Sequence, residues 1–118
     1  DLAWMQIHML RRLGIAARFV SGYYYLSGEQ TEFELHAWVE AYLPGAGWIG
    51  VDPGHGIAVG WNHIPVVASA FHEQAMPVTG SYRGSAVSRL QKDLKIIPLC
   101  PYAKSMFERH EALRDVLR

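Results

Sequence analysis

The sequence predicts an α+β fold, with a helix first, an antiparallel set of strands next and a second helix last. Residues 1–13 carry apolar side chains at the three- and four-residue spacing of an amphipathic helix. Residues 103–117 repeat that spacing, with Met106, Phe107 and Leu113 among the apolar positions. The segments between them are short and rich in β-branched and aromatic residues, which is typical of strands.

The first helix is expected from Asp1 to Leu13. Arg11 and Arg12 suit the negative end of its dipole, and Gly14 follows where a helix often closes in a left-handed conformation. The helical pattern is already present at Asp1, so we expect a chain that was cut inside this element at its N-terminus.

Five strands are expected after this helix, and a glycine-rich loop is expected over residues 53–60. Pro65 cannot donate a backbone hydrogen bond, so its strand should either lie at the edge of the sheet or begin later than residue 63. The predicted strands cover residues 15–26, 33–43, 48–51, 63–69 and 92–99.

The composition excludes several classes of partner and site. The 118 residues contain eleven basic and eleven acidic side chains, and half are apolar. A neutral chain lacks the basic surface that nucleic acid or an anionic membrane would need, so neither is expected as a partner. Cys100 is the only cysteine, which excludes an internal disulfide and a multi-cysteine zinc site. A reducing, cytoplasmic location is the default expectation.

The segment from Leu35 to Asp52 predicts a hairpin with a definite register. If residues 44–46 form a three-residue turn, Leu43 pairs with Gly47, and Val39 pairs with Val51. Side chains alternate along a strand, so the side chains of His36 and Asp52 then share one face as diagonal neighbours. Their Cβ atoms would lie roughly 7–8 Å apart, which allows a hydrogen bond between imidazole and carboxylate.

A carboxylate on one imidazole nitrogen fixes the tautomer and stabilises the cation formed when the other nitrogen takes a proton. Beside a thiol, such a pair produces a nucleophilic thiolate. His36 and Asp52 are therefore the candidate catalytic residues. The alternative from spacing alone is that His36 is a structural histidine and Asp52 a turn-former before Pro53.

Other side chains near this hairpin are weaker candidates. Trp38, Tyr42 and Trp48 share the face of His36 and are expected to line a cleft beside it, although they could also pack under the first helix. His55 and His63 flank the glycine-rich loop and could act with His36 as metal ligands. Their spacing matches no zinc pattern, so no metal site is expected.

Several motifs in one order resemble the bacterial transglutaminase-like superfamily: RLGIAARFVSGY at 12–23, LHAWVE at 35–40, GWIGVDP at 47–53, HIPVVA at 63–68 and PVTGSYRG at 77–84. The resemblance covers roughly residues 1–85. It implies a papain-like core. We expect a single domain of residues 1–118, in which residues 86–118, outside the resemblance, add a strand and a helix whose role the sequence does not define. In that family the catalytic order is Cys, His, Asp, which assigns the last two roles to His36 and Asp52.

The family places its nucleophile in a G-x-C-x-D stretch at the start of the first helix, and Asp1 aligns with the D. The resemblance therefore implies a cysteine two positions before Asp1, where the helix dipole would lower a thiol pKa. Cys100 follows the His–Asp pair in a stretch unlike the family. We expect it to be a small buried side chain. The alternative is that Cys100 itself acts as the nucleophile.

The resemblance implies thiol-dependent acyl transfer on a peptide or protein substrate, with hydrolysis ahead of cross-linking. No cofactor is expected, and no clustered acidic loop suggests calcium. Because the nucleophile is missing from the given residues, the chain alone is expected to be inactive. The competing interpretation is a catalytically dead peptide-binding or structural module of the same fold.

Overall fold

The structure is a computed structural model that describes residues 2–26, 32–85, 87 and 89. The chain divides into two compact units, Asp1–Tyr25 with Glu34–Thr79, and Leu26–Phe33 with Gly80–Arg118. Apart from Leu26, Glu32 and Phe33 at strand ends, the elements discussed below lie in the first unit. The strand expected over 92–99, the expected C-terminal helix and Cys100 lie outside the described residues.

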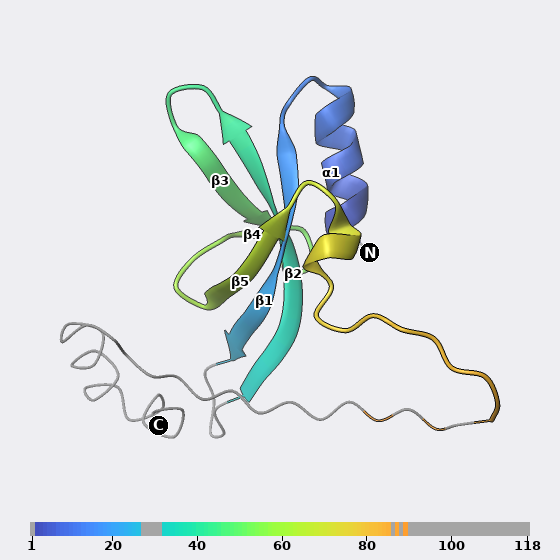
Figure 1. Cartoon of the computed structure of the whole chain (residues 1–118). Coiled ribbons are helices and arrows are strands. Elements are labelled where there is room, and N and C mark those ends of the chain that lie inside the picture. Colours follow the sequence, from blue (N-terminus) through green and yellow to red (C-terminus); the bar gives the residue numbers. More distant parts are fainter. Residues whose placement is uncertain (1, 27–31, 86, 88, 90–118) are drawn as a thin grey trace. The chain divides into compact units, whose positions relative to one another are not determined.

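One helix packs on one face of a five-stranded antiparallel sheet, as Figure 1 shows. The strand order is β4-β3-β2-β1-β5. This arrangement confirms the α+β prediction. The elements are α1 (Leu2–Arg12), β1 (Ala17–Leu26), β2 (Glu32–Leu43), β3 (Gly47–Asp52), β4 (Ile57–Ala58), β5 (His63–Ser69) and a short 3-10 helix, η1 (His72–Ala75).

The end of α1 follows the predicted signals. Gly14 has a φ of 78°, and its N–H donates to the carbonyl of Arg11 at 3.0 Å, which closes the helix in the left-handed conformation. The Arg11 guanidinium donates to the carbonyl oxygen of Ala17 at 2.9 Å and to that of Ala70 at 2.6 Å. These bonds tie the last turn of α1 to the start of β1 and to the residue after β5.

The apolar core lies between α1 and the sheet. Its largest members are Ile7 from α1, Phe19 from β1 and Val39 from β2, all at most 1% exposed. Ala37 also packs against this cluster, because it lies two residues from Val39 on the same face of β2. The intervening residues of β2, including His36, project from the other face, which leaves them outside the core under α1.

The edge position predicted from Pro65 is confirmed, because β5 pairs only with β1 in the sheet order. The ladder shifts register between Ser21 and Gly22, and Gly22 pairs with Pro65. A Cβ at residue 22 would lie 2.0 Å from the carbonyl oxygen of Ile64, so only glycine allows this close approach of the two strands. The irregularity accommodates a strand residue that has no N–H to donate.

The glycine-rich segment differs from the prediction. We expected a loop over residues 53–60, yet β4 lies within it and pairs Val51 with Ala58 and Asp52 with Ile57. A two-residue strand is too short to produce a periodic sequence signal, which is why the prediction missed it. The pairing folds the chain back immediately after Asp52 and holds the end of β3 in place.

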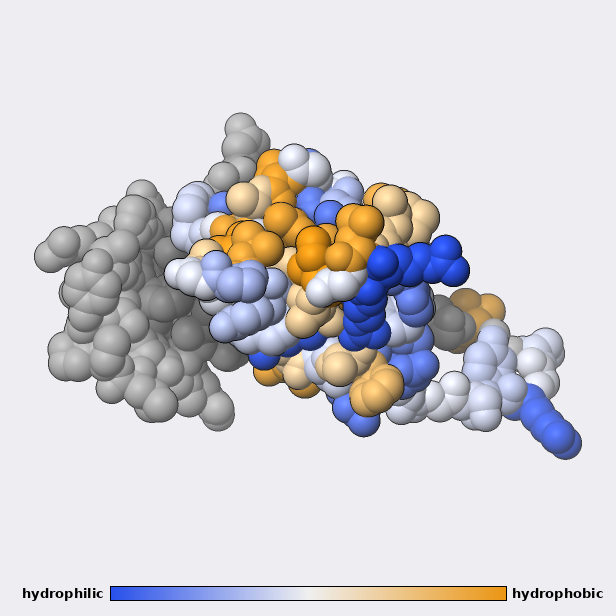
Figure 2. Space-filling model, turned by 90° about the horizontal axis from the view of Figure 1, so that it is seen from above, coloured by the Kyte–Doolittle hydropathy of each residue, from blue (hydrophilic) through white to orange (hydrophobic). Residues whose placement is uncertain are grey.

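Apolar side chains gather on the surface seen from above in Figure 2. The turn between β2 and β3 lies at the top of Figure 1, and exposed apolar residues at this end include Leu43 and, after α1, Leu13. Asp52 lies at the opposite end of the β2–β3 ladder. In the described part of the chain, none of the helices has the length and apolarity needed to span a bilayer.

Candidate active site

The β2–β3 hairpin brings His36 and Asp52 together. Val39 pairs with Val51 and Leu43 with Gly47, which confirms the register predicted from the sequence. Nε2 of His36 lies 2.7 Å from Oδ2 of Asp52. This is the distance of a charge-assisted hydrogen bond, in which Nε2–H donates to the carboxylate. Nδ1 of His36 has no hydrogen-bond partner among the described residues, so it is the ring nitrogen open to proton exchange.

Asp52 is the centre of a larger hydrogen-bonded cluster, and its side chain is fully buried. Oδ1 accepts the backbone N–H of Gly54 at 2.9 Å and that of His55 at 3.2 Å. Oδ2 lies 2.8 Å from Nδ1 of His55 and 3.0 Å from Nε2 of His63, in addition to the bond from His36. A buried carboxylate with this many donors is fixed in both position and orientation.

These contacts also set the ionisation of Asp52. Burial alone would raise the pKa of the carboxyl, because it penalises the charged form. Hydrogen bonds from His63, His55 and His36, with one from the backbone of His55, more than offset that effect, and they hold the pKa of Asp52 well below its usual range. Asp52 is therefore a carboxylate at neutral pH despite its burial.

The tautomer of His63 follows from its second contact. The backbone N–H of Gly60 donates to Nδ1 of His63 at 3.2 Å. A neutral imidazole that accepts at Nδ1 carries its proton on Nε2, so His63 donates from Nε2 to Asp52. His63 begins β5 and pairs with Tyr24 of β1, which places its buried ring against the carboxylate.

Aromatic rings surround the cluster. Tyr24 stacks on His55 with centroids 4.3 Å apart and an interplanar angle of 18°. Trp38 and His63 form a T-shaped ring pair at a centroid distance of 5.1 Å. Trp38 is only 1% exposed, so it shields the cluster from solvent on its inner side. These rings restrict the imidazoles to the orientations in which their nitrogens meet Asp52.

The three residues expected to line a cleft lie in different surroundings. Trp38 is buried beside His63, on the face of β2 opposite α1, so it does not pack under the helix. Tyr42 and Trp48 pair with each other at 5.5 Å near the hairpin turn and are both partly exposed. Arg18 covers Trp48 at 4.2 Å and is ion-paired with Glu40 at 2.6 Å. None of the three lines the pocket beside His36, and their cleft role stays a prediction.

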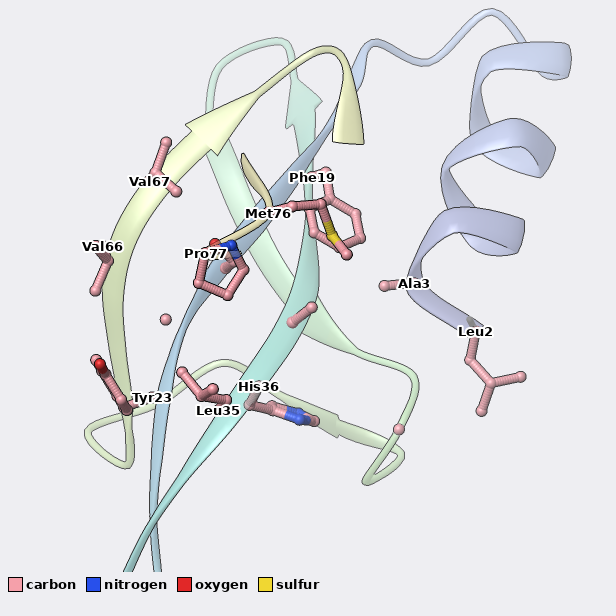
Figure 3. A pocket seen from close by; sticks show the side chains of 14 residues that line it. Leu2, Ala3, Phe19, Tyr23, Leu35, His36, Val66, Val67, Met76 and Pro77 are labelled. Atoms are coloured by element: carbon pink, nitrogen blue, oxygen red, sulfur yellow. The ribbon is translucent and has the colours of Figure 1, made fainter. Parts of the chain in front are cut away.

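A pocket of about 430 Å³ opens beside His36, as shown in Figure 3. The first turn of α1 contributes Leu2 and Ala3 to its wall, and Gly54 contributes from the segment after Asp52. A Cβ at Gly54 would lie 3.2 Å from Cε1 of His36. Glycine, which has no Cβ, avoids this close contact with the imidazole. The rest of the wall is mainly apolar, with Phe19, Val66, Val67, Met76 and Pro77 among its residues. One pocket thus joins the start of α1 to the imidazole.

Comparisons with known proteins point to one family for part of this chain. A protein-glutamine gamma-glutamyltransferase of Pseudomonas aeruginosa is 42% identical over 59 residues, which cover 42% of this chain and 8% of that protein. Residues 1–53 match the family model of the transglutaminase-like superfamily. This segment is transglutaminase-like.

An uncharacterized protein of Mycobacterium leprae is 29% identical over 104 residues, which cover 84% of this chain and 37% of that protein. The chain therefore spans little more than a third of one relative and less than a tenth of the other. No solved structure matches the chain.

The transglutaminase-like segment contains His36 and Asp52, while His55 and His63 lie after its last matched residue. The sequence drew attention to both later histidines but linked neither to Asp52. The signal for His55 was its place three residues after Asp52, where an aspartate-initiated turn returns the chain to the carboxylate. His63 reaches Asp52 only because β5 pairs with β1, a long-range contact that no local pattern reveals.

Proposed function

We propose that this chain supplies the general base and its orienting carboxylate to a thiol-dependent acyl-transfer site that acts on peptide or amide bonds. His36 is the base and acid, and Asp52 orients it. The observation that carries the proposal is the 2.7 Å bond from Nε2 of His36 to a fully buried carboxylate, beside a pocket that the first turn of α1 also lines. The transglutaminase-like match over residues 1–53 supports it.

The proposed chemistry uses the two nitrogens of His36 for different tasks. Nε2–H stays bonded to Asp52, and Nδ1 takes the proton of a thiol. The resulting thiolate attacks the amide carbon and forms a tetrahedral oxyanion. The C–N bond then breaks, the leaving amine takes the proton from His36, and a thioester remains. Water or a second amine attacks the thioester with His36 again as base, which releases the acyl product and restores the thiol.

The thiol is the missing component, because the part of the chain that the structure describes contains no cysteine. We propose that it belongs at the N-terminal end of α1, two positions before Asp1, as the family resemblance implies. Leu2 and Ala3 share the wall of the pocket with His36, which supports that location. A helix N-terminus lowers the pKa of a thiol, because the dipole favours the thiolate. We rank hydrolysis above cross-linking, and both outcomes share the thioester.

The test is turnover of a peptide amide by the full-length protein, including the residues that precede Asp1. We expect His36→Gln to lower kcat/KM by about 10²–10⁴-fold, the usual contribution of a positioned base. His8→Gln is the matched control, because His8 is an exposed histidine on α1 outside the cluster. Equal activity of the His36→Gln and His8→Gln proteins would overturn the assignment of His36.

A second measurement separates the enzyme from an inactive module of the same fold. If the residue two positions before Asp1 is cysteine, we expect rapid alkylation of that thiol by iodoacetamide, slowed in His36→Gln. A serine or alanine there, with peptide binding but no turnover, would support the module instead. The 118 residues alone are expected to release no product, and amide hydrolysis by this chain that depends on His36 would contradict the proposed source of the thiol.

A further inference from the structure

The hydrogen bonds to Asp52 exceed the number that its oxygens accept. A carboxylate offers roughly four lone-pair sites, two on each oxygen. Oδ1 already receives two backbone N–H groups, and Oδ2 lies within 3.0 Å of one nitrogen from each of three imidazoles. Five donors thus meet about four sites. One imidazole at Oδ2 is in excess as a donor, which leaves its nitrogen suited to another role.

The surplus donor at Oδ2 is the imidazole of either His36 or His55. Nε2 of His36 and Nδ1 of His55 lie only 3.2 Å apart, and both approach the same oxygen of Asp52. This separation also allows a hydrogen bond between the two rings, in which the N–H of one ring faces the unprotonated nitrogen of the other. Two nitrogen lone pairs at this separation suit a shared cation.

We propose that Nε2 of His36, Nδ1 of His55 and Oδ2 of Asp52 form a binding site for a divalent transition-metal ion of the zinc class. Tetrahedral zinc with bonds of about 2.0–2.2 Å separates neighbouring ligand atoms by roughly 3.3–3.6 Å. The observed separations are 2.7, 2.8 and 3.2 Å, so the two histidines need little rearrangement and Oδ2 moves by a fraction of an ångström. Three protein ligands leave a fourth position for water.

His63 acts as an outer partner of the metal site. Its Nε2 also lies near the other ligand atoms, within 4.8 Å of those of His36 and Asp52. However, the N–H of Gly60 points at its Nδ1, and an imidazole that binds metal through Nε2 needs its proton on Nδ1. Nε2–H of His63 therefore remains a donor to the carboxylate, which is the contact that usually orients a ligating group.

The surroundings favour zinc-like ions and give them access. Imidazole nitrogens suit zinc, cobalt, nickel and copper, whereas magnesium and calcium prefer oxygen ligands. The side chain of His55 is 34% exposed and that of His36 is 17% exposed, so an ion reaches the ligands from the surface. Tyr24 stacks on His55 and holds its ring in the ligating orientation.

The site does not depend on the proposed acyl transfer, because all three ligands belong to the described residues. The two roles exclude each other in time, since a metal ion on Nε2 of His36 replaces the N–H that bonds Asp52. The sequence led us to expect no metal site, and the folded arrangement of His55 changes that expectation.

Titration of the 118-residue chain with Zn²⁺ by calorimetry, and with Co²⁺ by visible absorption, tests the proposal. We expect one saturable site and the absorption of tetrahedral cobalt, with no response to Mg²⁺. His55→Phe keeps a ring for Tyr24 to stack on but removes the ligand, and it should weaken binding at least about tenfold, since even outer-shell losses cost 10–100-fold. His8→Phe is the matched control and should bind as the unaltered chain does.

His36→Gln provides a second variant, and circular dichroism checks that each variant is folded. We expect it to weaken Zn²⁺ binding as strongly as His55→Phe. Absence of saturable Zn²⁺ binding, or affinity that is unchanged in folded His55→Phe, would overturn the proposal. Neither result bears on the His36-dependent turnover by the full-length protein, so failure of the metal-site proposal would not affect the acyl-transfer proposal.

Discussion

The two faces of the sheet bury their side chains by opposite means. On the face under α1, Ile7, Phe19 and Val39 exclude water through apolar contact. On the other face the carboxylate of Asp52 is equally buried, and it is held by histidines rather than by apolar neighbours. Apolar packing is non-directional, whereas the polar cluster requires particular atoms in particular protonation states. We therefore expect the first face to contribute stability that changes little with pH, and the second to contribute both pH-dependent stability and the chemistry.

The largest effect is expected at the centre of the polar cluster. Asp52→Ala removes the acceptor shared by three imidazoles and two backbone N–H groups. Removal of one partner from a buried charged network costs about 3–5 kcal/mol of unfolding free energy. Urea unfolding at neutral pH measures it. A loss below about 1 kcal/mol, the range of an exposed ion pair, would mean that the cluster contributes little to stability.

Truncation on the apolar face provides the comparison. Ile7→Ala leaves a cavity against Phe19 and Val39, and such changes cost about 2–5 kcal/mol. Because the lost contacts are apolar, we expect a similar loss at pH 5 and pH 8 in urea unfolding. A loss that differs between these pH values by more than the experimental error would show that a titratable group acts on this face. The candidates are His72, whose ring lies 6.3 Å from that of Phe19, and the cluster around Asp52.

The pH dependence of stability should belong to the polar face. The pKa of Asp52 is lowered on folding, so the unfolded chain binds more protons at low pH. The stabilisation is present above the unfolded pKa of about 3.9 and is lost as the pH falls below it. Asp52→Asn should flatten this acid decline, while Glu34→Gln, an exposed carboxyl outside the cluster, should retain it. An unchanged acid slope in Asp52→Asn would contradict the lowered pKa.

The difference between the faces also explains what the sequence predicted. The register of Val39 with Val51 follows from the alternation of side chains and a short turn, so His36 and Asp52 could be paired from local sequence. The contact of His63 with Asp52 depends on the β1–β5 pairing, and β4 is too short to leave a pattern. Trp38 was expected beside a cleft, but its parity also suits the burial against His63 that the structure has. Local periodicity thus predicted the pair and missed the side chains that complete the cluster.

The most direct test of the central claim is the protonation of the His36 ring, measured by nitrogen-15 NMR of the 118-residue chain in metal-free buffer. The account predicts that at neutral pH Nε2 carries a hydrogen-bonded proton, and that Asp52→Asn shifts its resonance while leaving that of His8 unchanged. An unprotonated Nε2, or a His36 spectrum that does not respond to Asp52→Asn, would contradict the claim that the buried carboxylate orients this imidazole.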